Sequence, residues 1–346
     1  MADRLLDVDD LQVSFATEDG TVRAVDGVTF TLNRGEVVAI VGESGSGKSV
    51  TVMTLMGLTR GPNSQFGGAA RLGDRDLVSA SEQQLEGIRG KEIAMIFQDP
   101  ISSLSPVMRI GDQIVEQIRA HEDLSKAAAL DRAIELMERV GIPRARDRAR
   151  AYPHEFSGGM RQRVGIAMAL SLSPGVLIAD EPTTALDVTI QAQILQEITQ
   201  LSKESDSGVI FVTHDLGVVA DIADRVLVMY GGRVVEQGTL DEIFYDPQHP
   251  YTWGLLGSVT RMDREPPRRL PAIAGAPPSL VNAPTGCHFR PRCPHAFDRC
   301  TEVPPLESRV PEAPEHEDRC WLEPAEKRTR REVDGRIGLG AGAVPA

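Results

Sequence analysis

The distribution of hydrophobic and polar residues predicts an α/β core. Three short runs are almost continuously apolar, which is typical of parallel strands buried on both faces of a sheet. These runs are Glu36–Val41, Val176–Ala179 and Val209–Val212. Two other segments, Leu11–Phe15 and Val28–Leu32, alternate between apolar and polar residues and are predicted to be edge strands.

Further elements complete this α/β pattern. Ile93–Phe97 reads as another strand, and Arg225–Tyr230 with Arg233–Glu236 reads as a hairpin that turns at a Gly-Gly pair. Between the first two buried strands, apolar residues recur at the spacing of one helix face, and the helix is predicted to stop at Gly141. That face consists of Leu130, Ile134, Met137 and Val140. We therefore expect an α/β core with a helical insertion over about 100–172.

The character of the chain changes near Asp263. Six prolines lie between Pro266 and Pro284, which predicts an extended segment poor in regular structure. The last residues, 326–346, are charged and then rich in Gly and Ala, and we expect them to be disordered. Five basic residues between Lys327 and Arg336 fit a solvated tail or, alternatively, contact with anionic lipid. The predicted units are 1–262, 263–325 and 326–346.

Composition narrows the function classes. Aromatic residues make up only 4% of the 346 residues, so aliphatic side chains must form most of the core. The formal net charge of −13 argues against general nucleic-acid binding, which needs clustered Lys and Arg. No apolar run is long enough to span a membrane, and the N-terminus lacks a basic and then apolar leader. We expect a cytosolic protein that reaches any membrane through partners.

The segment Gly42–Ser49 has the composition of a phosphate-binding loop. It follows a buried strand and precedes an apolar helix over Val50–Leu58, which is the context that such a loop requires. Its glycines let backbone N–H groups surround phosphates at a helix N-terminus. Lys48 is expected to neutralise the β- and γ-phosphates of ATP, and the Ser49 hydroxyl to ligate Mg²⁺. A chance glycine turn is the alternative. The expected ATP-binding residues here are Gly42, Ser44, Gly45, Gly47, Lys48, Ser49 and Val50.

The strand Val176–Ala179 ends in two carboxylates, Asp180 and Glu181. Ligands of parallel sheets lie at the carboxyl ends of the strands, so both acids are expected at the ligand edge. Asp180 suits the Mg²⁺ shell, mainly through water. Glu181 is then available to orient or deprotonate an attacking water. The alternative is an acidic helix cap before Pro182.

Two polar residues at other strand ends are further catalytic candidates. Gln98 follows Ile93–Phe97, and its amide is suited to bridge Mg²⁺ or the lytic water to a mobile segment. His214 follows the strand Val209–Val212, where an imidazole is suited to hydrogen-bond the γ-phosphate or the attacking water. Taken singly, a Gln or a His at such a position is more often structural than catalytic.

A second glycine-rich turn, Phe156–Gln162, precedes a helix through Val164 and Met168. With this turn, the chain resembles the nucleotide-binding subunits of ATP-binding-cassette (ABC) transporters. The motifs follow the family's order, with Ser157–Gln162 as the signature. The others are the phosphate loop at Gly42–Ser49, the Q-loop at Gln98, the second acidic motif at Val176–Glu181, the D-loop at Ala185-Leu186-Asp187 and the switch histidine at His214.

The resemblance implies a head-to-tail dimer. ATP would lie between the phosphate loop of one subunit and the signature of the other, and Ser157, Gly159 and Asp187 are the further residues expected to bind it. Phe15 resembles the aromatic residue that stacks on adenine, although core packing explains it almost as well. Met160 replaces the usual Gln of the signature. Since Ser157 and Gly159 are retained, we expect a competent signature.

Other segments resemble the oligopeptide/dipeptide importer branch of the family. They are Gln98-Asp99-Pro100, Ser103–Pro106, His249–Thr252 and the C-terminal extension. The resemblance implies a second ATPase subunit, more often a different chain than a second copy, together with two membrane permeases and an extracytoplasmic substrate-binding protein. It also implies that the segment after Gln98 receives a permease coupling helix at the cytoplasmic face of the membrane.

Two alternative functions remain at this point. One is the same machine importing nickel or another small solute. The other is a soluble ABC ATPase of DNA repair or translation, which the single cassette, the lack of heptads and the acidic charge disfavour.

All four cysteines lie within 34 residues, spaced C-x5-C-x6-C-x19-C. In a cytosolic protein this favours a metal site over disulfides, but the spacing matches neither a zinc-finger pair nor a ferredoxin run. Zinc, an iron–sulfur cluster and unligated thiols all remain open, with His288, His295 and His316 as further zinc ligands. The resemblance favours a [4Fe–4S] cluster on Cys287, Cys293, Cys300 and Cys320, with a structural or a redox-sensing role.

Overall fold

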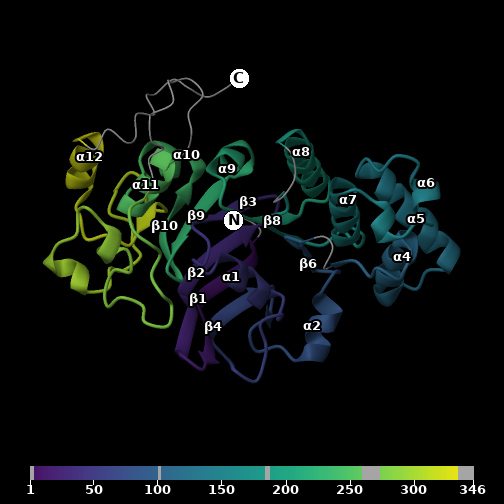
Figure 1. Cartoon of the computed structure of the whole chain (residues 1–346), viewed down its shortest axis with the longest axis horizontal. Helices are drawn as coiled ribbons and strands as arrows, with labels where there is room; N and C mark the ends of the chain where they lie inside the picture. The colour runs from purple at the N-terminus through teal and green to yellow at the C-terminus, as the bar shows by residue number, and fades with distance from the viewer. Residues whose placement is uncertain (1–3, 100–102, 184–187, 259–272, 334–346) are drawn as a thin grey trace.

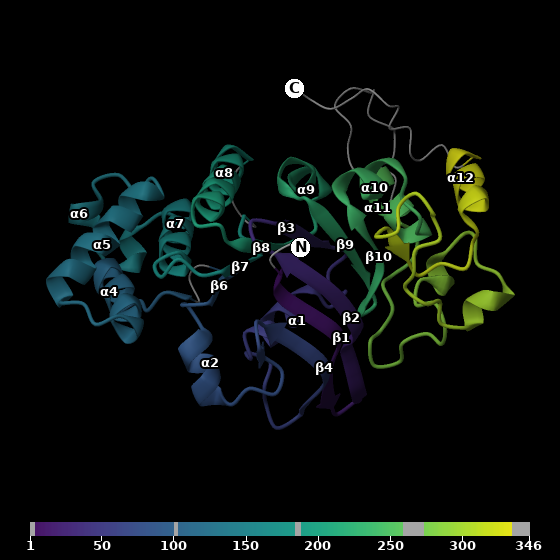
Figure 2. The same ribbon diagram turned by 180° about the vertical axis from the view of Figure 1, so that it is seen from behind.

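A computed structural model describes residues 4–99, 103–183, 188–258 and 273–333, and arranges them around two β-sheets (Figure 1). The helical insertion and the C-terminal extension lie at opposite ends of the molecule, with the sheets between them (Figures 1 and 2). The predicted α/β cassette, with its helical insertion and irregular extension, is therefore observed.

The central sheet has seven strands in the order β11-β10-β9-β3-β8-β7-β6. Strands β9, β3, β8, β7 and β6 run parallel, and β10 and β11 add antiparallel pairs at one edge. Every residue of β3, β7 and β8 is buried, which confirms the interpretation of the continuous apolar runs. The strands are β3 (Val37–Val41), β6 (Ile93–Ile96), β7 (Val176–Asp180), β8 (Gly208–Thr213), β9 (Arg225–Tyr230), β10 (Arg233–Thr239) and β11 (Glu317–Asp318).

The alternating N-terminal segments form a separate antiparallel sheet in the order β2-β1-β4-β5. Its strands are β1 (Arg4–Thr17), β2 (Gly20–Asn33), β4 (Ser64–Leu72) and β5 (Arg75–Asp76). The prediction of two edge strands is wrong for Leu11–Phe15, because β1 pairs with β2 on one side and β4 on the other. Alternation reports that one face of a strand is buried, and it does not report whether a neighbour pairs along the strand's edge.

The helical insertion packs α4, α5 and α7 around a common core, shown at the right of Figure 1. The predicted apolar face is confirmed, since Ile134, Met137 and Val140 are buried and Leu130 is partly buried against the same cluster. Helix α5 ends at Arg139, just before Gly141, as predicted. The helices are α4 (Ile110–His121), α5 (Lys126–Arg139), α6 (Ala145–Arg148) and α7 (Gly158–Ala169), with a 3₁₀ turn at Pro153–Glu155.

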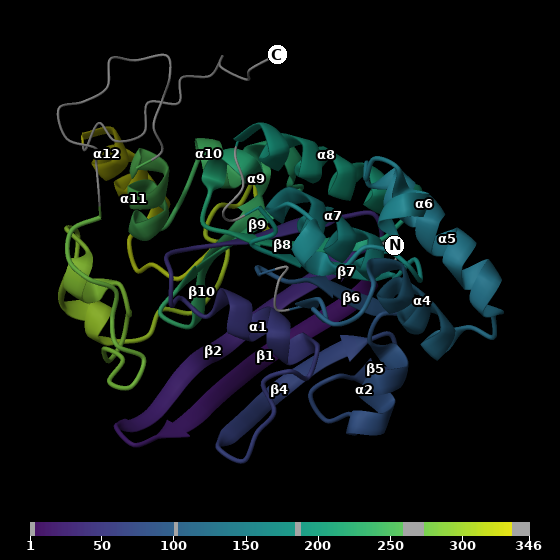
Figure 3. The same cartoon turned by 45° about the vertical axis from the view of Figure 1, so that its right-hand side comes forward.

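The other helices flank the two sheets (Figure 3). Helix α1 follows the phosphate loop and begins at Lys48, two residues before the predicted start. These helices are α1 (Lys48–Leu55), α2 (Glu82–Ile88), α8 (Val188–Glu204), α9 (Leu216–Ile222), α10 (Leu240–Tyr245) and α11 (Pro250–Ser258).

The C-terminal extension joins the central sheet through β11, which pairs with β10. Its other regular elements are two 3₁₀ turns, Arg290–Arg292 and Asp298–Thr301, and helix α12 (Pro324–Val333). A fully buried carboxylate, Glu236 of β10, accepts hydrogen bonds from the backbone N–H groups of Gln248 (2.5 Å) and His249 (2.9 Å) and lies 2.8 Å from His316 Nε2. His316 therefore joins the extension to a buried carboxylate of the core whose oxygens both accept hydrogen bonds.

Helix α12 overturns part of the predicted disorder. The prediction for 326–346 is wrong for residues 326–333, which form most of this helix. Lys327 is buried and donates to both carboxylate oxygens of Asp318 at 2.7 Å. Arg331 donates to Asp246 Oδ1 at 2.7 Å and Arg328 to Asp246 Oδ2 at 3.3 Å, so at least three of the five basic residues pair with acidic residues on other segments. Composition did not reveal these acidic partners, which lie on other segments of the fold.

No helix within the described part of the chain is both long and apolar enough to cross a membrane.

Candidate nucleotide-binding site

The phosphate loop follows the end of β3, in the backbone geometry that only glycine tolerates. Gly42 has φ 152° and Gly47 has φ 101°. A Cβ at Gly42 would lie 2.2 Å from the Met229 carbonyl oxygen, and one at Gly47 would lie 2.3 Å from that of Ala24. Backbone therefore approaches the loop too closely for any side chain at these two positions, whereas Ser44 and Gly45 are exposed at its tip.

Lys48 directs its ammonium group back across the loop. Its Nζ donates to the carbonyl oxygens of Gly42 at 2.8 Å and Glu43 at 3.1 Å. The side chain is buried, and this burial lowers the pKa of Lys48 against the opposing effect of nearby carboxylates. A charged donor held in this way favours an anionic acceptor, because phosphate oxygens accept stronger hydrogen bonds than carbonyls.

Ser49 and Asp180, the two residues assigned to Mg²⁺ from the sequence, lie in contact beside the loop. The Ser49 hydroxyl donates to Asp180 Oδ1 at 3.0 Å. Asp180 is buried, which raises the pKa of its carboxyl although the bond from Ser49 opposes the shift. A hydroxyl and a carboxylate side by side at a buried strand end fit a hard divalent cation, which takes oxygen ligands and offsets the cost of burying the charge.

The Glu181 carboxylate contacts the two other predicted catalytic residues. Gln98 Nε2 donates to Glu181 Oε2 at 3.0 Å, and His214 Nδ1 lies 3.2 Å from Glu181 Oε1. Glu181 has φ 45°, and its N–H donates to the Val212 carbonyl at 2.9 Å. The ends of β6, β7 and β8 thus bring together three side chains whose proximity the sequence did not show. A non-glycine residue in this left-handed conformation often marks a functional site.

The signature turn belongs to a different part of the molecule. Ser157 is the N-cap of α7, and its hydroxyl accepts from the Met160 N–H at 3.3 Å. Ser157 is exposed and Gly159 is half-buried. Among the described residues, no hydrogen bond joins Ser157 or Gly159 to the phosphate loop. The buried residues of α7 also pack in a different core cluster from those of α1.

Three predicted contacts fall outside this constellation. Phe15 is half-buried on β1, packed against the core, with Val22 and Ser64 as its strand partners. Val50 is half-buried in α1 and also packs against the core. Asp187 lies outside the residues that the structure describes.

The structure adds residues that sequence reasoning missed. The Glu43 N–H donates to the Tyr251 hydroxyl at 2.8 Å, and Arg292 binds the Glu43 carboxylate with both terminal nitrogens, at 2.6 and 3.1 Å. Ser46 is buried in the loop, and its Oγ has no hydrogen-bond partner among the described residues. Arg292 lies 249 positions from Glu43, so no local pattern reveals the pair.

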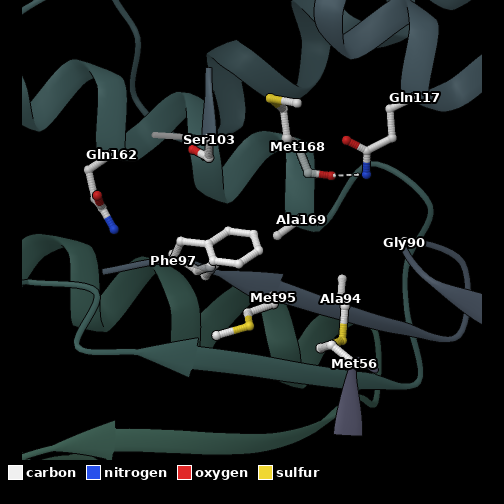
Figure 4. Close-up of a pocket in the computed structure, with 12 residues that line it drawn as sticks. Met56, Gly90, Ala94, Met95, Phe97, Ser103, Gln117, Gln162, Met168 and Ala169 are labelled. Atoms are coloured by element: carbon white, nitrogen blue, oxygen red, sulfur yellow. Dashed lines mark hydrogen bonds between the residues drawn. The ribbon is translucent and has the colours of Figure 1, made fainter. Parts of the chain in front are cut away.

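A cavity of about 180 Å³ lies where the helical insertion meets the core, directly beside the Q-loop (Figure 4). Phe97, Met95 and Met56 line it from the core, and Met168 and Gln162 of α7 line it from the insertion. Gln162 is buried, and its Nε2 has no hydrogen-bond partner within the described ranges. The cavity is thus a largely apolar space between two elements. One is α7, which follows the signature turn, and the other is β6, the strand that leads to Gln98.

The four cysteines form no disulfide, with Cys300 and Cys320 buried and Cys287 and Cys293 half-buried. Burial raises the pKa of Cys287, and raises the pKa of Cys293 and of Cys320 to about 12. Within the described residues, no three His, Cys, Asp or Glu side chains are grouped closely enough to hold a metal ion. The described residues therefore contain no site already arranged for a single metal ion.

The three candidate zinc-ligating histidines make other contacts. His288 Nδ1 lies 2.7 Å from the Gly231 carbonyl oxygen, and His316 Nε2 contacts Glu236. His295 packs edge-on against Trp253 with ring centroids 5.5 Å apart. These contacts engage all three histidines that were the further zinc-ligand candidates.

Comparison with known proteins identifies two matching family models. Residues 25–184 match the model described as "ABC transporter". Residues 235–300 match the model described as "Oligopeptide/dipeptide transporter, C-terminal region".

Curated relatives are similar over most of the chain. The oligopeptide transport ATP-binding protein OppD of Salmonella typhimurium is 52% identical over 310 residues, covering 90% of this chain and 92% of that protein. OppD of Bacillus subtilis is 54% identical over 320 residues, covering 92% and 89%. The dipeptide transport ATP-binding protein DppD of B. subtilis is 49% identical over 322 residues, covering 93% and 95%.

Solved structures with this fold include an ATP-binding cassette, MJ0796, in a dimeric post-hydrolysis state bound to ADP and Pi. It superposes with a TM-score of 0.61 at 26% identity and covers 68% of this chain and 98% of that one. The cbiO1 structure from Clostridium perfringens has a TM-score of 0.58 at 29% identity, covering 70% and 91%.

Proposed function

The chain belongs to the ABC transporter family, and on this premise we propose that it is the ATP-hydrolysing subunit of a membrane importer for oligopeptides or dipeptides. One observation carries the hydrolytic part of the proposal. Ser49, Asp180 and Glu181 meet at the phosphate loop, with Gln98 and His214 on the Glu181 carboxylate. The matched C-terminal region and the names of the relatives support the peptide cargo.

The residues have separate roles in the proposed reaction. The N–H groups of the loop and the Lys48 ammonium hold the ATP phosphates. Ser49 and Asp180, with Gln98 as a further candidate ligand, hold Mg²⁺, which when bound neutralises charge on the β- and γ-phosphates. Glu181 accepts a proton from the water that attacks the γ-phosphorus. Gln98 and His214 orient the Glu181 carboxylate. The side chain of His214 is 62% exposed, whereas that of Glu181 is 17% exposed.

Completion of the site requires a second subunit. The exposed N-terminus of α7 offers the backbone N–H groups and the partial positive charge of a helix start, which suit the γ-phosphate of ATP bound to another chain. The buried residues of α1 and α7 belong to different core clusters, which supports a phosphate loop and a signature that serve different ATP molecules. The partner is a second ABC ATPase subunit, either a different chain or a second copy. We propose Asp187 as part of the same interface, and Phe15 as the residue that stacks on adenine.

Two permeases and an extracytoplasmic substrate-binding protein complete the proposed machine, with this chain at the cytoplasmic face of the membrane. We propose that a permease contacts the insertion close to the Q-loop. There Val107 is 81% exposed, at a groove that Met108, Val115 and Tyr152 also line. A nickel or other small-solute importer would use the same subunit chemistry, because substrate choice rests largely with the other subunits.

Co-purification tests this assembly. The tagged full-length chain is extracted from its native membrane, and its partners are identified by mass spectrometry. We expect two permeases and an ATPase subunit, and we expect Val107→Asp to lose the permeases but keep ATP binding. Val303→Asp, at a residue that is 47% exposed on the extension, is the matched control and should retain them. Recovery of DNA-repair or translation factors in place of permeases would contradict the proposal.

We also propose that the four cysteines ligate a [4Fe–4S] cluster with a structural role. The thiols are electrostatic neighbours, since Cys300 acts on the pKa of both Cys287 and Cys293, and Cys293 acts on that of Cys320. Four Cys thiolates would hold such a cluster, and this segment supplies four cysteines that form no disulfide. Cluster binding would also stabilise a loop-rich segment that has few regular elements of its own.

Anaerobic purification tests the cluster. We expect about four irons per chain and a visible absorption band, both lost in Cys293→Ser and retained in the control His295→Gln. Protein without iron would refute the cluster, and stoichiometric zinc would favour the other metal.

A further inference from the structure

The C-terminal extension contacts the phosphate loop through the side chain of Arg292. Its Nη1 and Nη2 bind the two carboxylate oxygens of Glu43 at 2.6 and 3.1 Å. Glu43 is the second residue of the loop, directly after Gly42. A paired contact of this kind fixes the orientation of the carboxylate as well as its position.

Arg292 is itself held rigidly. Its side chain is only 5% exposed. Its Nε donates to the Ala274 carbonyl at 2.9 Å, Nη2 donates to the Ile273 carbonyl at 3.2 Å, and Nη1 also donates to the Tyr230 hydroxyl at 3.2 Å. The guanidinium is therefore positioned by the extension and by β9 together before it contacts the loop.

A cluster of aromatic rings completes this support. Tyr230 packs against Tyr251 with ring centroids 4.5 Å apart, and edge-on against Phe289 of the extension at 5.2 Å. The Tyr251 hydroxyl in turn accepts the N–H of Glu43 at 2.8 Å. Both the backbone and the side chain of Glu43 are thus fixed by residues that lie far from the loop in sequence.

The charge of Glu43 matters because phosphates are the expected occupants of the loop. Lys48 Nζ donates to the Glu43 carbonyl at 3.1 Å, and the Glu43 carboxylate is close enough to act on the charge state of Lys48. An unpaired carboxylate here would repel an anionic ligand and compete with it for the ammonium of Lys48. Arg292 cancels this charge from within the protein.

We propose that Arg292 is a positioning residue of the nucleotide site: through Glu43 it orients the phosphate loop and neutralises its acidic residue, so that the C-terminal extension helps to set the affinity for ATP. This role rests on the proposed ATP-binding function. Because Arg292 directly precedes Cys293, a rearrangement of the cysteine-bearing segment would also move the guanidinium.

The test compares nucleotide affinity and turnover in the assembled transporter. Arg292→Gln is expected to raise the KM for ATP about tenfold, as loss of a nearby compensating charge predicts, with kcat changed less than about twofold. Arg292→Lys should recover part of the affinity, because it keeps the charge but loses the paired geometry. Adding Glu43→Gln to Arg292→Gln should restore the affinity further, since it removes the uncompensated carboxylate.

Arg290→Gln is the matched control. Arg290 lies in the same 3₁₀ turn, and in the described part of the chain its side chain makes no hydrogen bond or ion pair. If Arg292→Gln leaves KM at the native value, the inference is refuted. A loss of affinity that Glu43→Gln does not relieve also refutes it, because only general damage to the fold would then explain the loss. Absence of ATP binding by the native complex would instead refute the proposed function.

Discussion

Replacing Glu181 with Gln is expected to slow ATP hydrolysis by about 10²–10⁴-fold while ATP binding persists. The carboxylate lies between Gln98 and His214 at the end of β7, where a water near the γ-phosphate would meet it. An amide of the same shape keeps an acceptor for Gln98 but takes up no proton at neutral pH. Lys48 and Ser49, which are assigned to ATP and Mg²⁺, are unchanged.

The measurement is single-turnover hydrolysis of ATP beside equilibrium nucleotide binding, in the assembled complex. Glu86→Gln, at an exposed position of α2, controls for removal of one acidic charge and should leave both quantities at the native level. Near-native turnover by Glu181→Gln would remove Glu181 as the general base. Loss of binding together with turnover would show that Glu181 holds the site together instead of acting on water.

Replacing Ser157 with Arg is expected to abolish hydrolysis at the partner's ATP site while this subunit still binds ATP. Ser157 is exposed at the N-terminus of α7, so a bulky cation there would block the approach of a facing phosphate group. Within the described residues, no hydrogen bond connects Ser157 with this chain's own loop. The defect should therefore appear in the other subunit's site.

Photolabelling with an azido-ATP measures which subunit holds nucleotide, and an ATPase assay of the assembled complex measures turnover. Ser125→Arg is the matched control, because Ser125 caps α5 in the same insertion by accepting the Ala128 N–H at 3.2 Å. Each substitution removes one helix cap, which costs about 1 kcal/mol of stability. Only Ser157→Arg also blocks the approach of the partner's ATP, so only this change should stop hydrolysis. Reduced labelling of this chain by Ser157→Arg would contradict the division of the site between subunits.

Much of the fold followed from local patterns. The buried runs of β3, β7 and β8 were recognisable because a strand covered on both faces has no polar positions. The apolar face of α5 was recognisable because its spacing matches the helical repeat. The central position of β1 and the order of helix α12 were not, because each depends on a partner elsewhere in the chain.

The candidate site divides in the same way. One part could be recognised in short motifs, because a phosphate loop and a strand end are local structures. This part consists of the loop glycines, Lys48, Ser49 and the pair Asp180-Glu181. Their convergence on Gln98 and His214 required the order of strands in the sheet, which brings the ends of β6, β7 and β8 together. The cysteine spacing said less about a metal site. A set of metal ligands is defined by the distances between their sulfur atoms in space, and the spacing along the sequence does not determine these distances.

By itself, the sequence determined the α/β cassette, its family and the residue types available to bind and hydrolyse a nucleotide, because those properties are recorded in local patterns. Only the tertiary structure decided that Gln98 and His214 meet at the Glu181 carboxylate, and that Arg292 reaches back to Glu43. The physical reason is the same in both cases. Packing and charge pairing act between segments that are distant along the chain, and no local pattern encodes which of them meet.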